Sequence, residues 1–243
     1  MTSYMILTLL FGSILSLFGT LLGASLAIFL KNPSKEVIAG LLGFSAGLMV
    51  TIALFELVPE AIIRWNLVSC ILFSFLAIGI MSILDKLIKF PSYSANSSMK
   101  VAFMAAIGIM LHNFPEGILM GAGFAQGSTL GIEMSILIAI HDIPEGLAVV
   151  APLLSSKLTN IKIMLFVFIT VLPTTIGTFI GVYMGGISDK YTAIASAIAA
   201  GIMCFVALME MLPESFRLSK NRFLNVFSFL IGIGFGLVII AIL

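Results

Sequence analysis

Charge is scarce in this sequence: only 9% of its 243 residues are Asp, Glu, Lys or Arg, whereas 60% are hydrophobic. A water-soluble domain uses about a quarter charged residues to cover its surface, so this composition excludes that class. Cysteine is scarce too, and Cys70 and Cys204 lie in apolar runs without metal-motif spacing. The net charge of +1 gives no indication of a nucleic-acid partner. We therefore expect an integral membrane protein.

Apolar runs of about 20 residues, the length that crosses a hydrocarbon core, fill nearly the whole chain. Eight transmembrane helices are predicted, at residues 4–30, 36–60, 66–88, 100–124, 130–154, 162–185, 191–214 and 222–243. The first run has no basic leader and no A-x-A cleavage pattern, so we expect a span rather than a signal peptide. The connections are short, and residues 1–243 are predicted to form a single transmembrane domain of the all-α class.

The basic residues predict the orientation, because Lys and Arg concentrate in cytoplasmic connections. Ten of the 12 lie in the connections 1–2, 3–4, 5–6 and 7–8: Lys31, Lys35, Lys86, Lys89, Lys100, Lys157, Lys162, Arg217, Lys220 and Arg222. The opposite connections hold only Arg64 and Lys190. This asymmetry predicts that both termini face outward, and it supports an even number of spans.

A repeat links the second and seventh spans. AGLMVTIALFELVPEA (46–61) and AGIMCFVALMEMLPES (200–215) match at eight of 16 positions, including an E-x-x-P-E core. The predicted topology runs these spans in opposite directions. Opposed copies are typical of inverted-repeat transporters, whose site lies near the midplane between the repeats. We expect spans 1–3 and 6–8 to be repeats around a central pair, spans 4 and 5.

The central spans carry a second antiparallel pair of motifs, LHNFPEGI (111–118) and IHDIPEGL (140–147). Residues four apart share a helical face, so each helix aims one imidazole and one carboxylate the same way. This ligand set suits Zn²⁺ and its neighbours Fe²⁺, Mn²⁺ and Cd²⁺, because Ca²⁺ and Mg²⁺ prefer oxygen alone. The predicted metal ligands are His112, Asn113, Glu116, His141, Asp142 and Glu145.

The free energy of membrane insertion supports this prediction, since an ionisable group at the bilayer centre costs about 2.5–3.5 kcal/mol on insertion scales. A bound cation is the simplest compensation. Hydrogen-bonded core histidines are the alternative for His112 and His141, although both histidines of the chain occupy the same motif position. For Asn113 a structural hydrogen bond and a ligand role stay open, and Asp142 is less easily explained as structure.

Four more glutamates, Glu56, Glu60, Glu210 and Glu214, lie towards the ends of spans 2 and 7. Solvated helix ends are the alternative for Glu60 and Glu214. Glu56 and Glu210 lie about one turn deeper, towards the outer and the inner face respectively. We predict that these glutamates line a transport path for cations on either side of the central site.

At HNFPEG (112–117) and HDIPEG (141–146) the chain resembles the bacterial branch of the ZIP (Zrt/Irt-like protein) metal transporters, over essentially its whole length. The resemblance implies transport of Zn²⁺, or of Fe²⁺, Mn²⁺ or Cd²⁺, into the cytoplasm across the inner membrane, by repeats that rock as an elevator. It implies a homodimer, and no cofactor apart from the cargo. It also implies two adjacent metals, one on His112, Glu116, His141 and Glu145, the other on Asn113 and Asp142 with both glutamates bridging.

Two features depart from the family pattern. Leu172 precedes Pro173 where binuclear bacterial members have a Glu, which removes a ligand of the second metal. The segment 86–100 contains no His, so no metal-sensing loop is expected there. Two rival functions are an intramembrane metal-dependent hydrolase, which needs an open coordination position and a separate general base, and a passive metal channel, which shares every ligand. The hydrolase lacks an HExxH motif, and the repeat symmetry has no obvious use in hydrolysis.

Overall fold

The computed structural model describes residues 3–30, 33–87, 97–153, 158–184 and 188–242. Inside these ranges the side chains of several residues, among them His141 and Pro144, lie outside the described part. Every element within the description is helical. The elements are α1 (Ser3–Phe29), α2 (Lys35–Ile52), η1 (Ala53–Leu57), α3 (Val58–Arg64), α4 (Leu67–Leu87), α5 (Ser97–Gln126), α6 (Ser128–Leu153), α7 (Asn160–Met184), α8 (Asp189–Phe205), η2 (Val206–Met211), α9 (Leu212–Leu218) and α10 (Arg222–Ile242).

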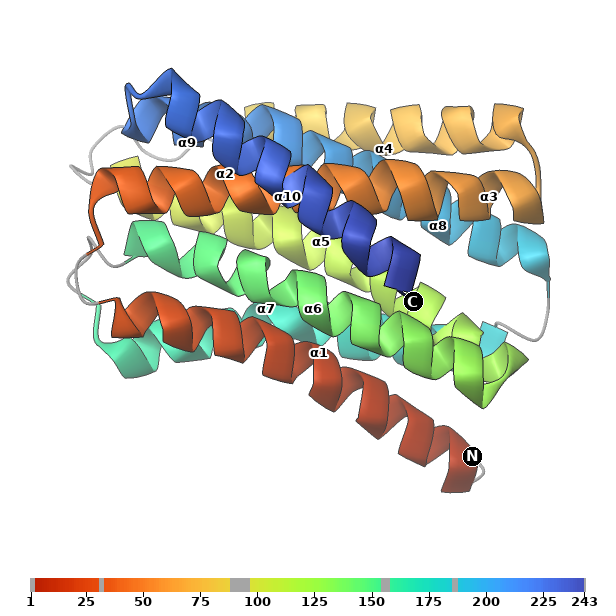
Figure 1. Ribbon diagram of the computed structural model, residues 1–243. Coiled ribbons are helices and arrows are strands. Elements are labelled where there is room, and N and C mark those ends of the chain that lie inside the picture. The colour runs from red at the N-terminus through yellow and green to blue at the C-terminus, as the bar shows by residue number, and fades with distance from the viewer. Residues whose placement is uncertain (1–2, 31–32, 88–96, 154–157, 185–187, 243) are drawn as a thin grey trace.

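Two of the long helices are composite. α2, η1 and α3 run without a break, as do α8, η2 and α9, so the twelve elements form eight helical segments. Within the described residues, six of these segments are long and apolar enough to cross a membrane: Ile6–Phe29, Lys35–Arg64, Leu67–Leu87, Asn160–Tyr183, Asp189–Leu218 and Arg222–Ile242. The prediction of an all-helical membrane protein is confirmed. The segments run lengthwise side by side and alternate in direction, so α1 begins and α10 ends towards the same end of the bundle (Figure 1).

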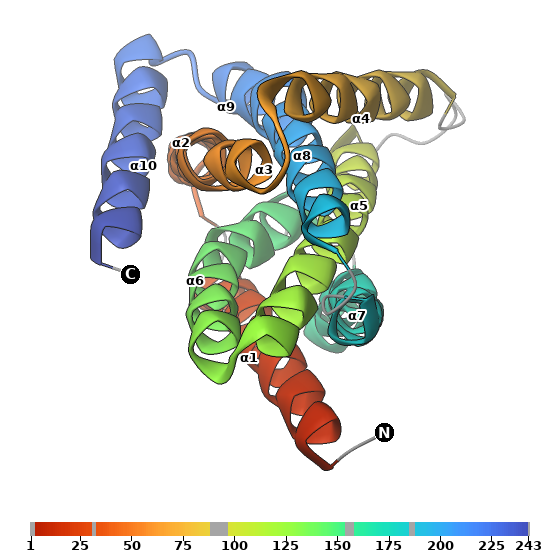
Figure 2. The ribbon, with the colours of Figure 1, turned by 90° about the vertical axis from the view of Figure 1, so that its right-hand side faces the viewer.

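The helices form two groups, which Figure 2 shows end-on. In one group α5 packs along α7 and α6 packs along α1; in the other α2 packs along α10 and α8 packs along α4. The groups meet where α8 contacts α5 and α2 contacts α6. The inner helices are more buried than the outer ones: 72% of the apolar stretch of α8–α9 is buried, against 17% of that of α4. The outer helices therefore present large apolar side chains outward, as a membrane-embedded surface requires.

A π-helical turn interrupts α2–α3 and α8–α9 at matching places in the E-x-x-P-E repeat. Pro59 and Pro213 have no backbone N–H to continue the α-helical ladder. One residue before each proline, the Val58 N–H bonds to the carbonyl of Ala53 and the Leu212 N–H to that of Ala207, five residues back in each case. Such π-turns absorb a break in the helical hydrogen bonding and occur often at functional sites. Here the turns contain Glu56 and Glu210, the first glutamate of each repeat.

Candidate metal centre

The predicted ligands lie in the middle of α5 and α6, the two helices that pack against each other at the centre of the bundle. Their described side chains are all buried: His112 is 0% exposed, Asn113, Asp142 and Glu145 are 1%, and Glu116 is 2%. α5 continues through Pro115, so the motif keeps its helical spacing. The side chain of His141 lies outside the described residues, although its backbone belongs to α6.

The two helices are joined by an imidazole–carboxylate contact. His112 Nε2 lies 3.0 Å from Glu145 Oε1. The other ring nitrogen, Nδ1, is 3.1 Å from the carbonyl oxygen of Gly108. A carbonyl can only accept, so Nδ1 carries a hydrogen and Nε2 is the nitrogen that faces Glu145. A backbone carbonyl that orients the imidazole in this way is a common outer-shell partner of metal-binding histidines.

Asn113 and Asp142, which occupy matched positions in the two motifs, each reach to an outer helix. Asn113 Nδ2 donates to the carbonyl of Thr170 on α7 at 2.9 Å. Ser16 on α1 donates its hydroxyl to Asp142 Oδ2 at 2.6 Å. The structural hydrogen bond considered for Asn113 is therefore present, made by its nitrogen. Among the described residues, Asn113 Oδ1 and Glu145 Oε2 are buried without a hydrogen-bond partner, so both keep lone pairs for a ligand.

The described side chains show two contacts within the predicted ligand set and its surroundings. His112 and Glu145 are in contact, and Asp142 accepts a hydrogen bond from Ser16. Among the described side chains, no three His, Cys, Asp or Glu residues stand close enough together to hold a metal ion. Among the described side chains, the His112–Glu145 contact therefore provides one nitrogen and one carboxylate of the expected Zn²⁺-type site.

Glycine allows the helices around this site to approach closely. A Cβ built on Gly117 would collide with the carbonyl oxygen of Thr174, and one built on Gly146 with that of Thr20. These glycines directly follow Glu116 and Glu145. Both glycines therefore serve close helix packing, which is typical of membrane helices.

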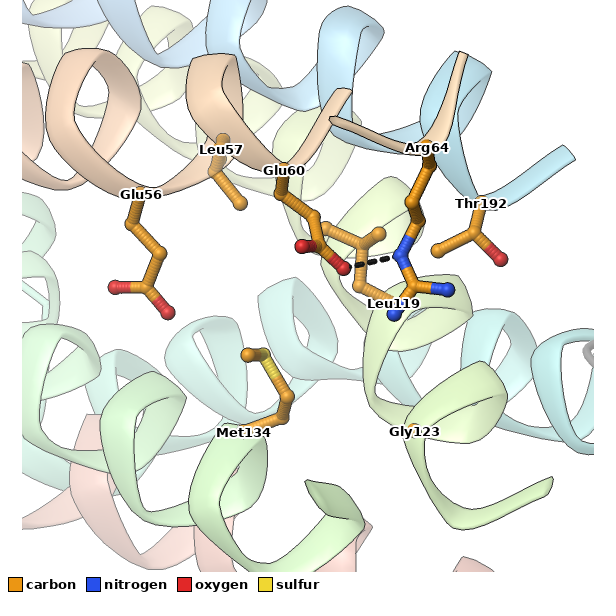
Figure 3. Close-up of a pocket in the computed structure, with 8 residues that line it drawn as sticks. All are labelled: Glu56, Leu57, Glu60, Arg64, Leu119, Gly123, Met134 and Thr192. Atoms are coloured by element: carbon orange, nitrogen blue, oxygen red, sulfur yellow. Dashed lines mark hydrogen bonds and ion pairs between the residues drawn. The ribbon is translucent and has the colours of Figure 1, made fainter. Parts of the chain in front are cut away.

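A small pocket of about 60 Å³ lies between α3, α5, α6 and α8, at the end of the bundle that the charge pattern predicts to face outward (Figure 3). Its lining consists of Glu56, Leu57, Glu60, Arg64, Leu119, Gly123, Met134 and Thr192. Arg64 forms ion pairs with Glu60 and, at 2.9 Å, with Asp189. One lining residue, Leu119, is one turn beyond Glu116 on α5, so the pocket lies about one helical turn from a predicted ligand.

A second cavity, of about 240 Å³, shares Glu56 and Met134 with this pocket and is also lined by Glu133, Leu137 and Ile240. Sequence analysis did not single out Glu133. A carboxylate inside an apolar span was the available signal, but Glu133 stands outside the repeated motifs. At the opposite end of the bundle Glu210 is half-buried in its π-turn, and Glu214 forms an ion pair with Arg217 at 2.5 Å.

The residues Ser16, Thr170 and Thr174 were also missed. All three are buried hydroxyl residues; Ser16 on α1 contacts the central pair through its side chain, and Thr170 and Thr174 on α7 through their backbone carbonyls. Single Ser and Thr residues in apolar spans are common, so only the packing of α1 and α7 identifies these. Leu172 is 43% exposed, so the position where the family pattern has a glutamate faces away from α5 in this chain.

Comparison with known proteins places these features in a family. Residues 92–242 match the model of the ZIP Zinc transporter family. The Zinc transporter ZupT of Corynebacterium aurimucosum is 28% identical over 83% of this chain and 84% of its own length. The ZupT of Chlorobium chlorochromatii is 29% identical over 88% and 91%. Zinc transporter ZIP10 of Mus musculus is 35% identical over 114 residues, which are 47% of this chain but only 14% of ZIP10. The chain belongs to the ZIP zinc transporter family.

Proposed function

We propose that this protein carries divalent transition-metal ions, zinc first, across a membrane into the cytoplasm through the His/Glu site between α5 and α6. The observation that carries the proposal is the buried contact between His112 and Glu145, from two helices at the centre of an apolar bundle. The relatives are named as zinc transporters, which supports zinc as the transported ion. No relative among those named is a hydrolase, so the comparisons lend the enzyme alternative no support.

The arrangement that we propose has eight spans in one transmembrane domain, with spans 1–3 and 6–8 as inverted repeats. Three correspondences support it. The packing of α1 against α6 corresponds to that of α7 against α5, and the packing of α2 against α10 corresponds to that of α8 against α4. A π-turn also precedes the proline in both repeats. The charge asymmetry supports an inner-membrane protein with both termini outside. A homodimer is part of the proposal and follows from the family resemblance.

The proposed mechanism begins at the outer pocket, where Glu56 and Glu60 attract a hydrated cation. The ion exchanges water for His112, Glu145 and the remaining predicted ligands Asn113, Glu116, His141 and Asp142, and one or two metals are held there. It then leaves towards Glu210 and Glu214. The ligands whose side chains are described, all but His141, are 2% exposed or less, so neither side reaches them directly. Relative movement of the two helix groups is therefore required, because burial on this scale closes both paths at once.

Uptake of radioactive zinc into proteoliposomes tests this function. The wild-type protein is compared with a His112→Ala/Glu145→Ala double variant and with Glu36→Gln, which alters an exposed carboxylate in the first turn of α2. We expect saturable uptake by the wild type and by Glu36→Gln, and its loss in the double variant. Mn²⁺, Fe²⁺ and Cd²⁺ as competitors rank the cargo. Absence of uptake by monodisperse wild-type protein, for every one of these metals, would overturn the proposal, and non-saturable uptake would favour the channel.

A further inference from the structure

A buried hydroxyl beside the metal centre departs from the usual pattern of this bundle. Serine and threonine inside a helix satisfy their hydroxyl by donating to the carbonyl four residues back. Five buried examples here do so at 2.7–3.1 Å: Thr20, Thr51, Ser135, Thr178 and Ser196. Thr174 on α7 is 1% exposed, and among the described residues its Oγ1 has no hydrogen-bond partner.

Asn113 accounts for this departure. The acceptor that Thr174 would use is the carbonyl of Thr170, one turn back, and this oxygen takes the hydrogen bond from Asn113 Nδ2 at 2.9 Å. A carbonyl oxygen has two lone pairs, and inside a helix one of them serves the N–H one turn on. The amide of Asn113 takes the other. Occupying that acceptor leaves the Thr174 hydroxyl without its local bond.

The same contact leaves a second oxygen without a partner. With Nδ2 bound to Thr170, the Oδ1 atom of Asn113 is buried and unbonded among the described residues. Asn113 therefore bonds to the carbonyl one turn before Thr174, and each of these two side chains keeps one buried oxygen without a partner among the described residues. An unsatisfied buried oxygen is unfavourable, so a ligand of positive charge is expected beside them. Asn113 directly follows His112 on α5, and Gly117, which follows Glu116, packs against the Thr174 carbonyl, so Asn113 and Thr174 are both neighbours of predicted ligands on the α7 side of α5.

We propose that Asn113 Oδ1 and Thr174 Oγ1 form a neutral oxygen subsite that contributes ligands to the transported divalent ion, and that Thr174 thereby determines metal selectivity. The inference rests on the proposed function. Leu172, at the position of the family carboxylate, faces outward, so the oxygen that α7 contributes is the uncharged one of Thr174, two residues further on. Oxygen ligands suit Mn²⁺ better than the softer Zn²⁺ and Cd²⁺. The subsite therefore raises the affinity for Mn²⁺ relative to Zn²⁺.

The test compares Thr174→Val, which removes the oxygen at nearly constant volume, with Thr174→Ser, which keeps it. Thr178→Val is the matched control, because this threonine is buried one turn along the same helix but its hydroxyl is satisfied by the Thr174 carbonyl. Each variant is assayed in proteoliposomes for Mn²⁺ and Zn²⁺ uptake. Mn²⁺ binding to the purified protein is measured separately by electron paramagnetic resonance.

Thr174→Val is expected to lower kcat/KM for Mn²⁺ relative to Zn²⁺ by about fivefold, the effect of one neutral oxygen contact, and to weaken Mn²⁺ binding similarly. Thr174→Ser and Thr178→Val should keep the wild-type ratio. An unchanged ratio in Thr174→Val, or an equal loss for both metals, would overturn the subsite. Failure of the wild type to transport any metal would instead overturn the proposed function, and Mn²⁺ binding by the purified variants would still decide the subsite.

Discussion

The hydrogen bond from Ser16 to Asp142 offers a direct measure of how α1 supports the metal centre. Ser16 is 0% exposed and Asp142 is 1% exposed, and their oxygens are 2.6 Å apart. Hydrogen bonds to charged groups contribute about 1.5–3 kcal/mol in water-soluble proteins. Interhelical bonds in membranes average about 0.6 kcal/mol with a maximum near 1.7. A short, fully buried bond belongs near that maximum, so we expect Ser16→Ala to cost about 1.5 kcal/mol.

For a chain of this size, 1 kcal/mol corresponds to roughly 2–4 °C in Tm, so Ser16→Ala should unfold about 3–6 °C earlier in detergent. Ser13→Ala is the matched control. Ser13 lies on the same helix, also buried, but its hydroxyl has no hydrogen-bond partner among the described residues. We expect its Tm to stay at the wild-type value or to rise.

Zinc affinity supplies a second readout for the same variants. Loss of an outer-shell partner commonly weakens metal binding by about 10–100-fold, so Ser16→Ala should bind Zn²⁺ more weakly in titration calorimetry if Asp142 is a ligand. Equal Tm values for Ser16→Ala and the wild type, or the same loss in Ser13→Ala, would refute the energetic argument. A lower Tm with unchanged zinc affinity would confine Asp142 to a structural role.

Three further outcomes are expected. Gly232→Ala should destabilise the protein by about 1–3 kcal/mol, because the added Cβ would collide with the Phe44 carbonyl. Gly234→Ala has open space around it, so its stability should be unchanged or higher by up to about 1 kcal/mol. Equal unfolding curves for the two variants would contradict this. Arg64→Gln removes the cation that pairs with Glu60 at the outer pocket, so KM for zinc should fall at low ionic strength. In 0.5 M salt, where the Debye length is only about 4 Å, KM should equal the wild-type value. A change in KM that does not depend on salt would exclude electrostatic attraction. Imidazole and carboxylate ligands must be deprotonated to hold a metal, so uptake should decrease from about pH 8 to pH 5, and a flat profile would count against histidine ligands.

The sequence alone determined the features that depend on local spacing and composition. Apolar length predicted the helical segments to within a few residues, for example 66–88 against Leu67–Leu87 for α4. The i, i+4 spacing put His112 and Glu116 on one face of α5. These properties follow from helical geometry and from the cost of charge in a membrane, which are the same wherever the helix lies in the fold.

Only the tertiary structure decided which side chains meet. His112 faces Glu145, Asp142 accepts from Ser16, and Asn113 donates to the Thr170 carbonyl. Each of these contacts depends on how the helices α1, α5, α6 and α7 rotate and slide against one another. The π-turns around Glu56 and Glu210 were likewise not predicted, because a proline can be absorbed by a kink, a π-turn or a helix end. Sequence periodicity determines the face of each helix, but the partner across that face is chosen by packing between residues distant along the chain.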